Sequence, residues 1–320
     1  MKGIRKVRPT DLLALLSTER MAYQNEAYPW ERIGARDRGP RPLESAVEQW
    51  LSFATGRHTW VRVSRQTLQG MAAVRKRGRG AVWEVDCLFA PDGEVAQALL
   101  ERVGESAAQF GVEKVFLRLA VESDALEAAR KAGLMPYAHE RLWHCQRVTA
   151  RSESAGYSLR QRTPADDFGI FRLYCEVAPV EMRQIEAVTL REWIGARDAR
   201  MGMRSRQMVL EREGRIMAWV LSSNADGGMC LTMLVHPEVE NGVGEILEAA
   251  VGVRKGRRDI SCLLPEYATA VISVLAGSGF KPGMEYVALG RRLQRPVGEL
   301  EEAKPAMTRG YSVPTVFTEP

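Results

Sequence analysis

The chain has 320 residues, which is long for one compact α/β domain and comfortable for two domains of about 150 residues, each with its own core. Hydrophobic residues make up 45% of it and charged residues 27%, which excludes a disordered or fibrous protein. The net charge of +5 is modest and spread along the chain, so composition does not favour nucleic acid as the partner.

The cellular location is predicted from the absence of membrane-spanning and signal segments in the sequence. No stretch approaches the roughly 20 consecutive apolar residues that span a bilayer, and the opening MKGIRKVRP has no apolar signal core. The five cysteines are widely separated, without the paired spacing of a zinc site. The sequence therefore predicts a cytoplasmic protein without membrane contact and without a metal.

The two halves of the chain begin alike. The first opens with IRKVRPTDLLALL, a short strand ending at Pro9 and a helix capped by Thr10 or Asp11. The second opens with YSLRQRTPADDFGIF, where Asp166 or Asp167 caps the next helix. Each half is thus expected to start with a strand followed by a helix.

The middle of each half holds an apolar strand that stops at a proline. These strands are VWEVDCLFAP and MCLTMLVHP, and their prolines, Pro91 and Pro237, lie 146 positions apart. Each is followed by an amphipathic pattern, over 94–110 and 244–253, which predicts a helix packed on the sheet.

The ends of the two halves also match. Buried strands VFLRLAV and ISCLLP lead into predicted helices over 124–132 and 268–276, which stop at Gly133 and Gly279, again 146 positions apart. Glycine there is suited to the left-handed conformation that ends a helix. A last strand, HERLWHCQRV or EYVALGRRL, is expected to close each half, and the common spacing predicts an internal duplication.

Domain limits follow from composition. The small, polar run TARSESAG at 149–156 is typical of a short linker. Beyond Leu293 the periodicity is lost and prolines accumulate. We therefore predict a first domain over 1–150, a second over 156–295 and an extended tail over 296–320.

The order of predicted elements in each half resembles the GNAT fold of acyl-CoA N-acyltransferases, over about 140 residues per copy. The strongest local likenesses are the proline-stopped strand and the Gly-Leu or Gly-Phe pair that ends the last helix. The resemblance implies an α/β protein of two consecutive GNAT-like domains. It also implies acetyl transfer from acetyl-CoA to the amine of a small molecule or peptide; the alternative is a non-catalytic ligand-binding or protein-interaction module. The oligomeric state stays open.

In this family the pantetheine arm pairs with the fourth strand where that strand diverges from the fifth, and the diphosphate lies on a glycine-rich turn. The segment HPEVENGVGEIL carries two glycines with the family's spacing. The resemblance implies coenzyme contacts from Leu234, Val235, Asn241, Gly242, Val243 and Gly244.

Other features of the turn favour a purely structural role. Val239 stands where the family usually has a basic residue or glutamine, and the acids Glu238 and Glu240 would repel phosphate. In the first half the matching segment, PDGEVAQALL, keeps only Gly93. The first half is therefore predicted to be a scaffold copy, with coenzyme bound chiefly by the second.

Acyl transfer to an amine needs a base for the ammonium and often an acid for the leaving thiolate. The family frequently supplies the acid as a tyrosine four residues before the last helix's final glycine, but Ala129 and Leu275 stand at those positions. Tyr267 is the substitute candidate for the acid, and Glu266 for the base, directly or through water. The alternative is a solvated helix start, where glutamate is favoured by the helix dipole.

Two acids on one strand are candidates for acceptor binding. Glu84 and Asp86 alternate, so they share a face of a strand that is expected to be largely buried. They either line a cleft for a cationic amine, with Trp30 as a wall, or pair with arginines across the sheet. The basic run at 75–79 (RKRGR) predicts a solvated hairpin turn, with phosphate or nucleic-acid contact as the alternative.

Overall fold

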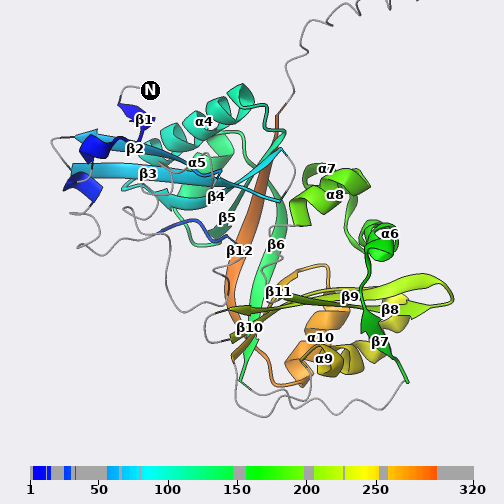
Figure 1. Ribbon diagram of the computed structural model, residues 1–320. Helices are drawn as coiled ribbons and strands as arrows, with labels where there is room; N and C mark the ends of the chain where they lie inside the picture. Colours follow the sequence, from blue (N-terminus) through cyan, green and yellow to red (C-terminus); the bar gives the residue numbers. More distant parts are fainter. Residues whose placement is uncertain are drawn as a thin grey trace, which may run out of the picture.

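The computed structural model describes residues 3–11, 13–15, 25–29, 33, 56–64, 67–78, 81–146, 156–197, 205–225, 228–251 and 259–293. Their strands form one continuous 12-stranded sheet in the order β1-β2-β3-β4-β5-β12-β6-β11-β10-β9-β8-β7. Figure 1 shows two groups of strands and helices, joined by the long strands β6 and β12. The prediction of an α/β fold with a mixed sheet is confirmed.

In the first half, α4 and α5 pack together over the core of the sheet. The described elements are β1 (Ile4–Lys6), η1 (Pro9–Asp11), β2 (His58–Ser64), β3 (Thr67–Lys76), β4 (Val82–Phe89), α4 (Gly93–Gln109), β5 (Lys114–Ala120), α5 (Ala125–Lys131) and β6 (Met135–Cys145).

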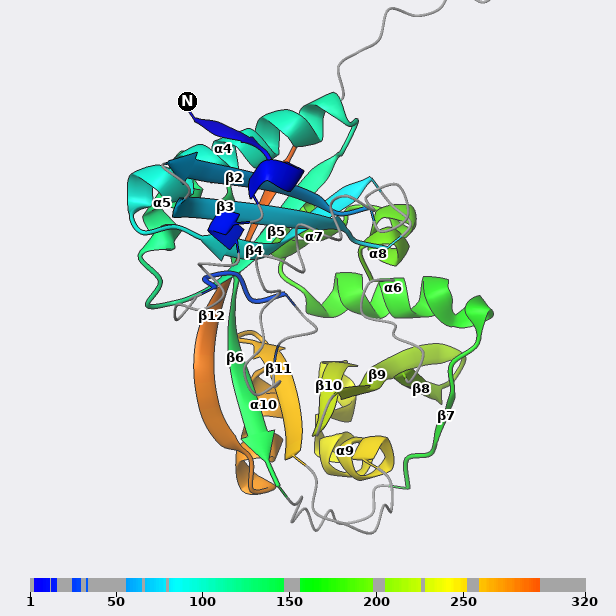
Figure 2. The same ribbon diagram turned by 60° about the vertical axis from the view of Figure 1, so that its left-hand side comes forward.

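In the second half, α9 and α10 cover one face of the sheet, and α6, α7 and α8 lie on the other face at the junction with the first half (Figure 2). The described elements are β7 (Leu159–Gln161), η3 (Pro164–Asp166), α6 (Asp167–Val177), α7 (Val180–Glu186), α8 (Leu190–Arg197), β8 (Ser205–Arg212), β9 (Arg215–Ala225), β10 (Gly228–Val235), η5 (Pro237–Gly242), α9 (Val243–Val251), β11 (Asp259–Pro265), α10 (Thr269–Gly277) and β12 (Lys281–Arg292).

The matching stops and caps in the sequence have matching structures. Gly133 and Gly279 have φ values of 84° and 88°. Each is followed by a residue whose N–H bonds back to the last turn of the helix, Leu134 to Ala129 O at 3.0 Å and Phe280 to Leu275 O at 3.1 Å. These are the bonds of a glycine-ended helix, as predicted. The linker at 149–156, apart from Gly156, and the tail at 296–320 lie outside the described residues.

The same aspartate contact occurs at the N-terminal end of each half. Asp11 accepts from the Arg8 N–H at 2.8 Å and pairs with Arg5 at 2.6 Å. Asp166 likewise accepts from the Thr163 N–H at 2.7 Å and pairs with Arg160. Each aspartate thus satisfies a free backbone donor at the entrance of the first helix of its half.

The closing strands differ from the expectation that each half closes its own sheet. β12 pairs antiparallel with β5 of the first half, from Tyr286 opposite Ala120 to Arg292 opposite Lys114. β6 pairs with β11 of the second half, and β6 and β12 also pair with each other. The halves therefore exchange their last strands. A strand's apolar pattern is the same whichever partner it pairs with, so the local pattern could not reveal the exchange.

The hydrophobic cores record the same exchange. The core of the first half contains Val287 and Leu289 from β12. The core of the second half contains Trp143 and Cys145 from β6. Each core is complete only with a strand from the other half.

Both halves keep a splay between their parallel central strands. β4 and β5 pair only over Val82–Glu84 and Lys114–Phe116. β10 and β11 pair only over Gly228–Leu231 and 259–262. Beyond these residues the strands of each pair diverge, so each half has a wedge-shaped opening at the centre of its sheet.

Replacing Leu289 by Ala tests the exchange, because Leu289 is fully buried in the first-half core although it comes from the second half of the sequence. We expect the unfolding free energy to fall by about 2–5 kcal/mol. Urea denaturation should show one transition for the whole chain, since neither core is complete alone. The control Met284→Ala lies on the same strand at 47% exposure and should change stability by no more than about 0.5 kcal/mol. Two transitions, of which only one shifts, would contradict the exchange.

Candidate functional site

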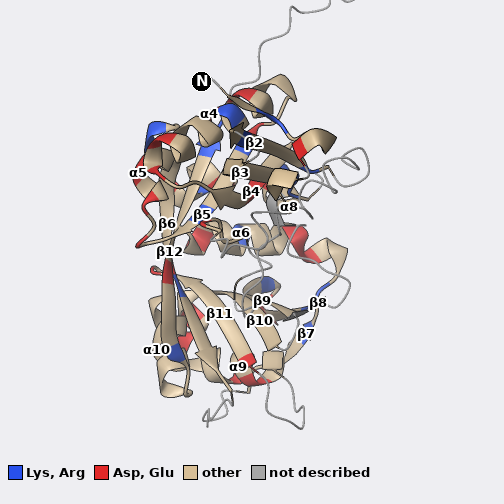
Figure 3. Ribbon diagram, turned by 90° about the vertical axis from the view of Figure 1, so that its left-hand side faces the viewer, with Lys and Arg blue, Asp and Glu red and all other residues tan. Residues whose placement is uncertain are grey.

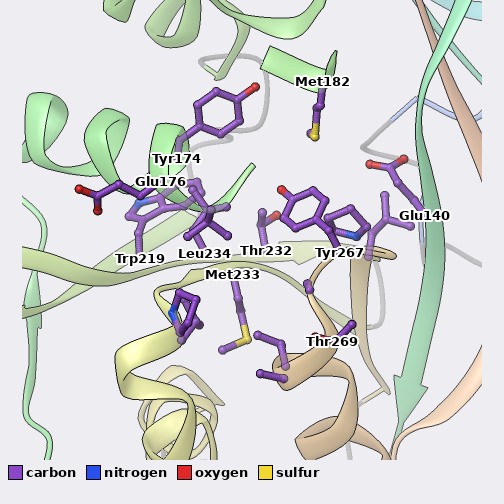
Figure 4. Close-up of a pocket in the computed structure, with 18 of the residues that line it drawn as sticks. Glu140, Tyr174, Glu176, Met182, Trp219, Thr232, Met233, Leu234, Tyr267 and Thr269 are labelled. Carbon is purple, nitrogen blue, oxygen red and sulfur yellow. The ribbon is translucent and has the colours of Figure 1, made fainter. Parts of the chain in front are cut away.

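A cavity of about 170 Å³ opens at the splay of the second half. Its floor is formed by the diverging ends of β10 and β11 and the first turn of α10, and α6, α7 and α8 form its roof. Figure 4 shows Tyr174 and Met182 above the strand residues Thr232, Met233 and Leu234, with Tyr267 and Glu140 at the side. Most of the wall is apolar or aromatic, as in small-molecule sites.

The two strand residues predicted to contact the coenzyme, Leu234 and Val235, line this cavity. Beside them the Oγ1 of Thr232 is buried and has no hydrogen-bond partner among the described residues. No loop segment in the described part of the chain makes a backbone hydrogen bond to 232–235. The splay of the second half therefore offers strand surface that a ligand can reach.

The predicted phosphate turn is a short 3-10 helix, η5, that runs directly into α9. Its Pro237 and Glu240 line the end of the cavity. Several of its amides already have acceptors: the Val239 N–H bonds His236 O at 3.0 Å, and the Val243 N–H bonds Glu240 O. Internal hydrogen bonds thus use donors that a diphosphate would need.

Gly242 has a packing role in this turn. A Cβ at Gly242 would lie 2.0 Å from Cδ2 of Tyr157, so the tyrosine ring rests directly on the glycine backbone. Tyr157 is held there by its own N–H, which donates to the Glu245 carboxylate at 2.9 Å. Asn241 is exposed, and its Oδ1 accepts from the Tyr157 hydroxyl at 3.4 Å, while Gly244 is buried in α9.

The electrostatics of this end are acidic. Glu238 and Glu240 are both exposed, and Glu245 follows in the first turn of α9. Figure 3 shows acidic residues, in red, beside α9. The helix dipole favours an anion at this point, but the carboxylates oppose a phosphate.

The two catalytic candidates from the sequence lie in different surroundings. Tyr267 lines the cavity and packs against the core that α6 and α8 form with the sheet. Glu266 is exposed, lies outside the described wall of the cavity, and donates its N–H to His139 O at 2.9 Å. The family's usual acid position is closed in both halves, since Leu275 and Ala129 are fully buried.

A buried carboxylate that the sequence analysis missed lies in the roof of the cavity. Glu186, at the end of α7, is 8% exposed and accepts from the Tyr174 hydroxyl at 3.2 Å. Burial, and then the charge of Glu186, raises the pKa of Tyr174 well above its usual value, so the phenol stays neutral and donates. Lys114 of the first half bonds the Glu186 backbone oxygen at 2.9 Å and fixes the end of α7. Helical periodicity marks Tyr174 as a core residue, and no motif singles out Glu186.

The first half contributes two charged residues to the same cavity. Glu140 comes from β6 and pairs with Arg118 at 2.6 Å. Arg77 comes from the end of the β3–β4 hairpin. Neither could be assigned to the second half from sequence, because only the exchanged strands bring the hairpin and β6 to this wall.

The acceptor-binding candidates Glu84 and Asp86 are both buried in ion pairs. Glu84 pairs with Arg75 at 2.6 Å and Asp86 with Arg57 at 2.8 Å, which is the arginine alternative of the sequence analysis. Burial would raise the pKa of Glu84, but nearby guanidinium groups outweigh it and lower the pKa to about 2. Neither acid is among the residues that line the cavity, and Trp30 lies outside the described residues.

The splay of the first half is filled by its own chain. The Glu26 N–H donates to Leu88 O at 2.8 Å on β4, and the Tyr28 N–H donates to Arg118 O at 2.9 Å on β5. The Asn25 side chain accepts from the Leu88 N–H at 2.8 Å. The segment 25–29 therefore bridges the diverging strands in the place where the family's pantetheine arm would lie.

Comparison with known proteins gives a fold. No known sequence family matches the chain. No curated protein matches it. Among solved structures, a tandem GNAT protein from the clavulanic acid biosynthesis pathway aligns with 90% of this chain and 98% of its own, at 16% identity and a TM-score of 0.50. A Drosophila protein aligns with 91% of this chain and 98% of its own, at 13% identity and a TM-score of 0.51. At these identities the likeness establishes the tandem GNAT fold of this chain.

None of the described helices is both long and apolar enough to cross a membrane. Within the described ranges, no three side chains of His, Cys, Asp or Glu come together as a metal site would require.

Asn25→Ala tests the filled splay of the first half. The change leaves the Leu88 N–H without its acceptor inside the sheet, so we expect the unfolding free energy to fall by about 1–3 kcal/mol. Asn241→Ala is the matched control, because its exposed side chain makes a single contact at 3.4 Å and should matter by no more than about 0.5 kcal/mol. Equal urea midpoints for the two variants would contradict the bridging role of Asn25.

Proposed function

We propose that the second half binds the pantetheine arm of an acyl-CoA between β10 and β11 and transfers the acyl group to an amine. The observation that carries the proposal is the contrast between the two splays. The first is bridged by 25–29, whereas Thr232–Val235 line a cavity and include a buried hydroxyl that no described residue hydrogen-bonds. An extended arm can add to an exposed strand there by backbone hydrogen bonds.

The nucleotide end of the donor fits less well than its arm. The turn at η5 has internal hydrogen bonds and Tyr157 against Gly242, and its acids oppose phosphate. Most of the donor's binding free energy is therefore assigned to the arm and the thioester. These same features support the second candidate, a non-catalytic module that holds an apolar or cationic ligand in this cavity.

The charges around the cavity support an amine as the acceptor. Four carboxylates belong to its wall: Glu140 and Glu176, which pair with Arg118 and Arg215, and Glu186 and Glu240. A cavity walled by acids and apolar rings concentrates cations. The aromatic residues Trp193 and Trp219 add faces on which an ammonium group can rest.

Glu186 and Tyr267 are the residues proposed for the proton transfers. The Glu186 carboxylate removes a proton from the bound ammonium, and the neutral amine then attacks the thioester carbonyl. As the new C–N bond forms and the C–S bond breaks, the Tyr267 hydroxyl supplies a proton to the thiolate and regains one from the attacking nitrogen. Tyr174 is a positioning residue, since its hydroxyl orients Glu186. Glu266 stays a candidate base that would act through water.

Donor binding is tested by thermal melting with acetyl-CoA. At about 100 times its dissociation constant the ligand should stabilise the protein by about 2.7 kcal/mol. Ala270 lines the cavity in α10, so Ala270→Trp should fill the site and remove the shift. Ala276→Trp, on an exposed position of the same helix, should keep it. If acetyl-CoA leaves the wild-type melting temperature unchanged, the acyltransferase proposal is wrong and the ligand-binding module is favoured.

Glu186→Gln tests the base. We expect kcat to fall by about 10²–10⁴-fold, with acetyl-CoA affinity unchanged. Thiol release with an amine mixture measures the rate, and Glu181→Gln, exposed on the same helix, should behave as wild type. A variant that loses acetyl-CoA affinity and rate together would indicate a structural role for Glu186.

A further inference from the structure

Arg77 is the basic residue whose place in the structure differs most from its sequence prediction. The run at 75–79 predicts a solvated hairpin turn, yet Arg77 is only 3% exposed and lines the cavity of the second half. Its N–H closes the hairpin on Val82 O at 2.8 Å, and Gly78 turns the chain with a φ of 61°. The backbone thus holds the side chain inward.

Arg77 also differs from the other buried cations. Within the described part of the chain, Arg57, Arg77, Lys114 and Arg118 are buried below 9% exposure. Three of them have a carboxylate partner: Arg57 reaches Asp86 at 2.8 Å, Lys114 reaches Glu192 at 2.7 Å, and Arg118 reaches Glu140 at 2.6 Å. The guanidinium of Arg77 has no hydrogen bond or ion pair to a described carboxylate; it stacks on the Phe116 ring, 5.0 Å from the centroid.

Nearby carboxylates are already used. Glu84 is hydrogen-bonded to Arg75 at 2.6 Å, and Arg77 acts on it only through its charge, helping to lower the pKa of Glu84. Glu140 is held by Arg118. A buried charge without a hydrogen-bonded partner is costly, and within the described residues no carboxylate satisfies the guanidinium donors of Arg77 in the cavity wall.

The chemistry of the guanidinium identifies what is missing. Its planar fork of donors matches a carboxylate or phosphate through two parallel hydrogen bonds. The turn expected for the donor's phosphates, with Pro237 and Glu240, follows β10. Arg77 instead lies by Phe116 of β5, on the far side of β6 and β11 in the sheet. An anion bound by Arg77 therefore lies away from the η5 turn that was expected to hold the donor's phosphates.

We propose that Arg77 binds a carboxylate carried by a substrate in this cavity, an inference that rests on the proposed acyl transfer. The carboxylate belongs either to the acceptor, an amino-acid-type molecule whose ammonium faces Glu186, or to an acyl group that ends in a carboxylate. In both cases the substrate carboxylate meets Arg77 and the acceptor's ammonium group meets Glu186, and these two residues line the same cavity. An acceptor of this class needs an anion site and a cation site a few ångströms apart.

The first experiment asks whether Arg77 is structural. Thermal melting of Arg77→Gln without ligand should give a higher melting temperature than that of Arg75→Gln, because Arg77 loses only a stack on Phe116 and a charge interaction with Glu84 and no described ion pair. The matched control Arg75→Gln breaks the pair with Glu84 and should lower the melting temperature by several degrees. If Arg77→Gln melts as low as Arg75→Gln, Arg77 is a structural cation and the proposal is wrong.

The second experiment asks which substrate brings the carboxylate. The probes are a mixture of the common amino acids and the same mixture as amides, with acetyl-CoA, and then malonyl-CoA and succinyl-CoA with the amides. Acylated products are detected by mass. We expect one carboxylate-bearing probe to exceed its uncharged counterpart by at least tenfold in rate. Arg77→Gln should remove that preference, and Arg77→Lys should restore part of it.

The outcomes separate this proposal from the proposed function. A wild type that acetyl-CoA stabilises, but that acylates amino acids and amides equally and prefers no acidic acyl group, overturns the role of Arg77 alone. A wild type that acetyl-CoA does not stabilise overturns acyl transfer. In that case, melting with the amino acids alone decides the carboxylate site, which requires a shift that is absent in Arg77→Gln.

Discussion

The exchange of β6 and β12 is the constraint on which the rest of the structure depends. The two strands lie side by side at the centre of the sheet, each paired with the other and with the half it does not come from. Val287 and Leu289 complete one core while Trp143 and Cys145 complete the other, so the hydrophobic free energy of each half includes a strand from its partner. Lys114 extends the link by joining β5 to the ends of α7 and α8. This continuity brings Glu140 and Arg77 into the wall of a cavity that otherwise belongs to the second half.

The two splays solve one physical problem in different ways. Where parallel strands diverge, their facing N–H and C=O groups lose partners and must find others. In the first half the segment 25–29 supplies them, with Asn25 accepting from the Leu88 N–H and Glu26 donating to Leu88 O. The first half also keeps only Gly93 of the phosphate turn. Closing its splay therefore does not remove a coenzyme site, because little of the turn is left to hold a diphosphate. In the second half the cavity stays open between Thr232–Val235 and the end of β11.

The sequence predicted those features that depend on short-range chemistry. Gly133 and Gly279 end their helices in the left-handed conformation, Pro91 precedes α4 and Pro237 begins η5, because backbone sterics act within a few residues. The exchanged strands could not be predicted, since pairing partners are chosen by long-range packing. Burial of Arg77 was missed for a related reason: a run of four basic residues looks solvated until its neighbours Arg75 and Arg118 are seen to use the available carboxylates. Tyr174 and Glu186 meet only through the packing of α6 on α7.

Polar side chains in the cavity wall that lack described partners indicate the site better than the glycine motif does. The Tyr157 ring that packs on Gly242 explains why a glycine is needed there. The glycine spacing by itself is therefore weak evidence for phosphate binding. Among the described residues the Thr232 hydroxyl has no hydrogen-bond partner and Arg77 no ion pair with a carboxylate, and both line the same cavity. Buried polar groups in native proteins are mostly hydrogen-bonded, so a polar group in a cavity wall that lacks a described partner is a place where a ligand can supply one. By this argument the duplicated fold has become unequal. In the first copy, residues 25–29 hydrogen-bond the diverging strands, and Arg77 of this copy lines the cavity of the second. The cavity of the second copy thus contains the polar groups that a substrate would bind.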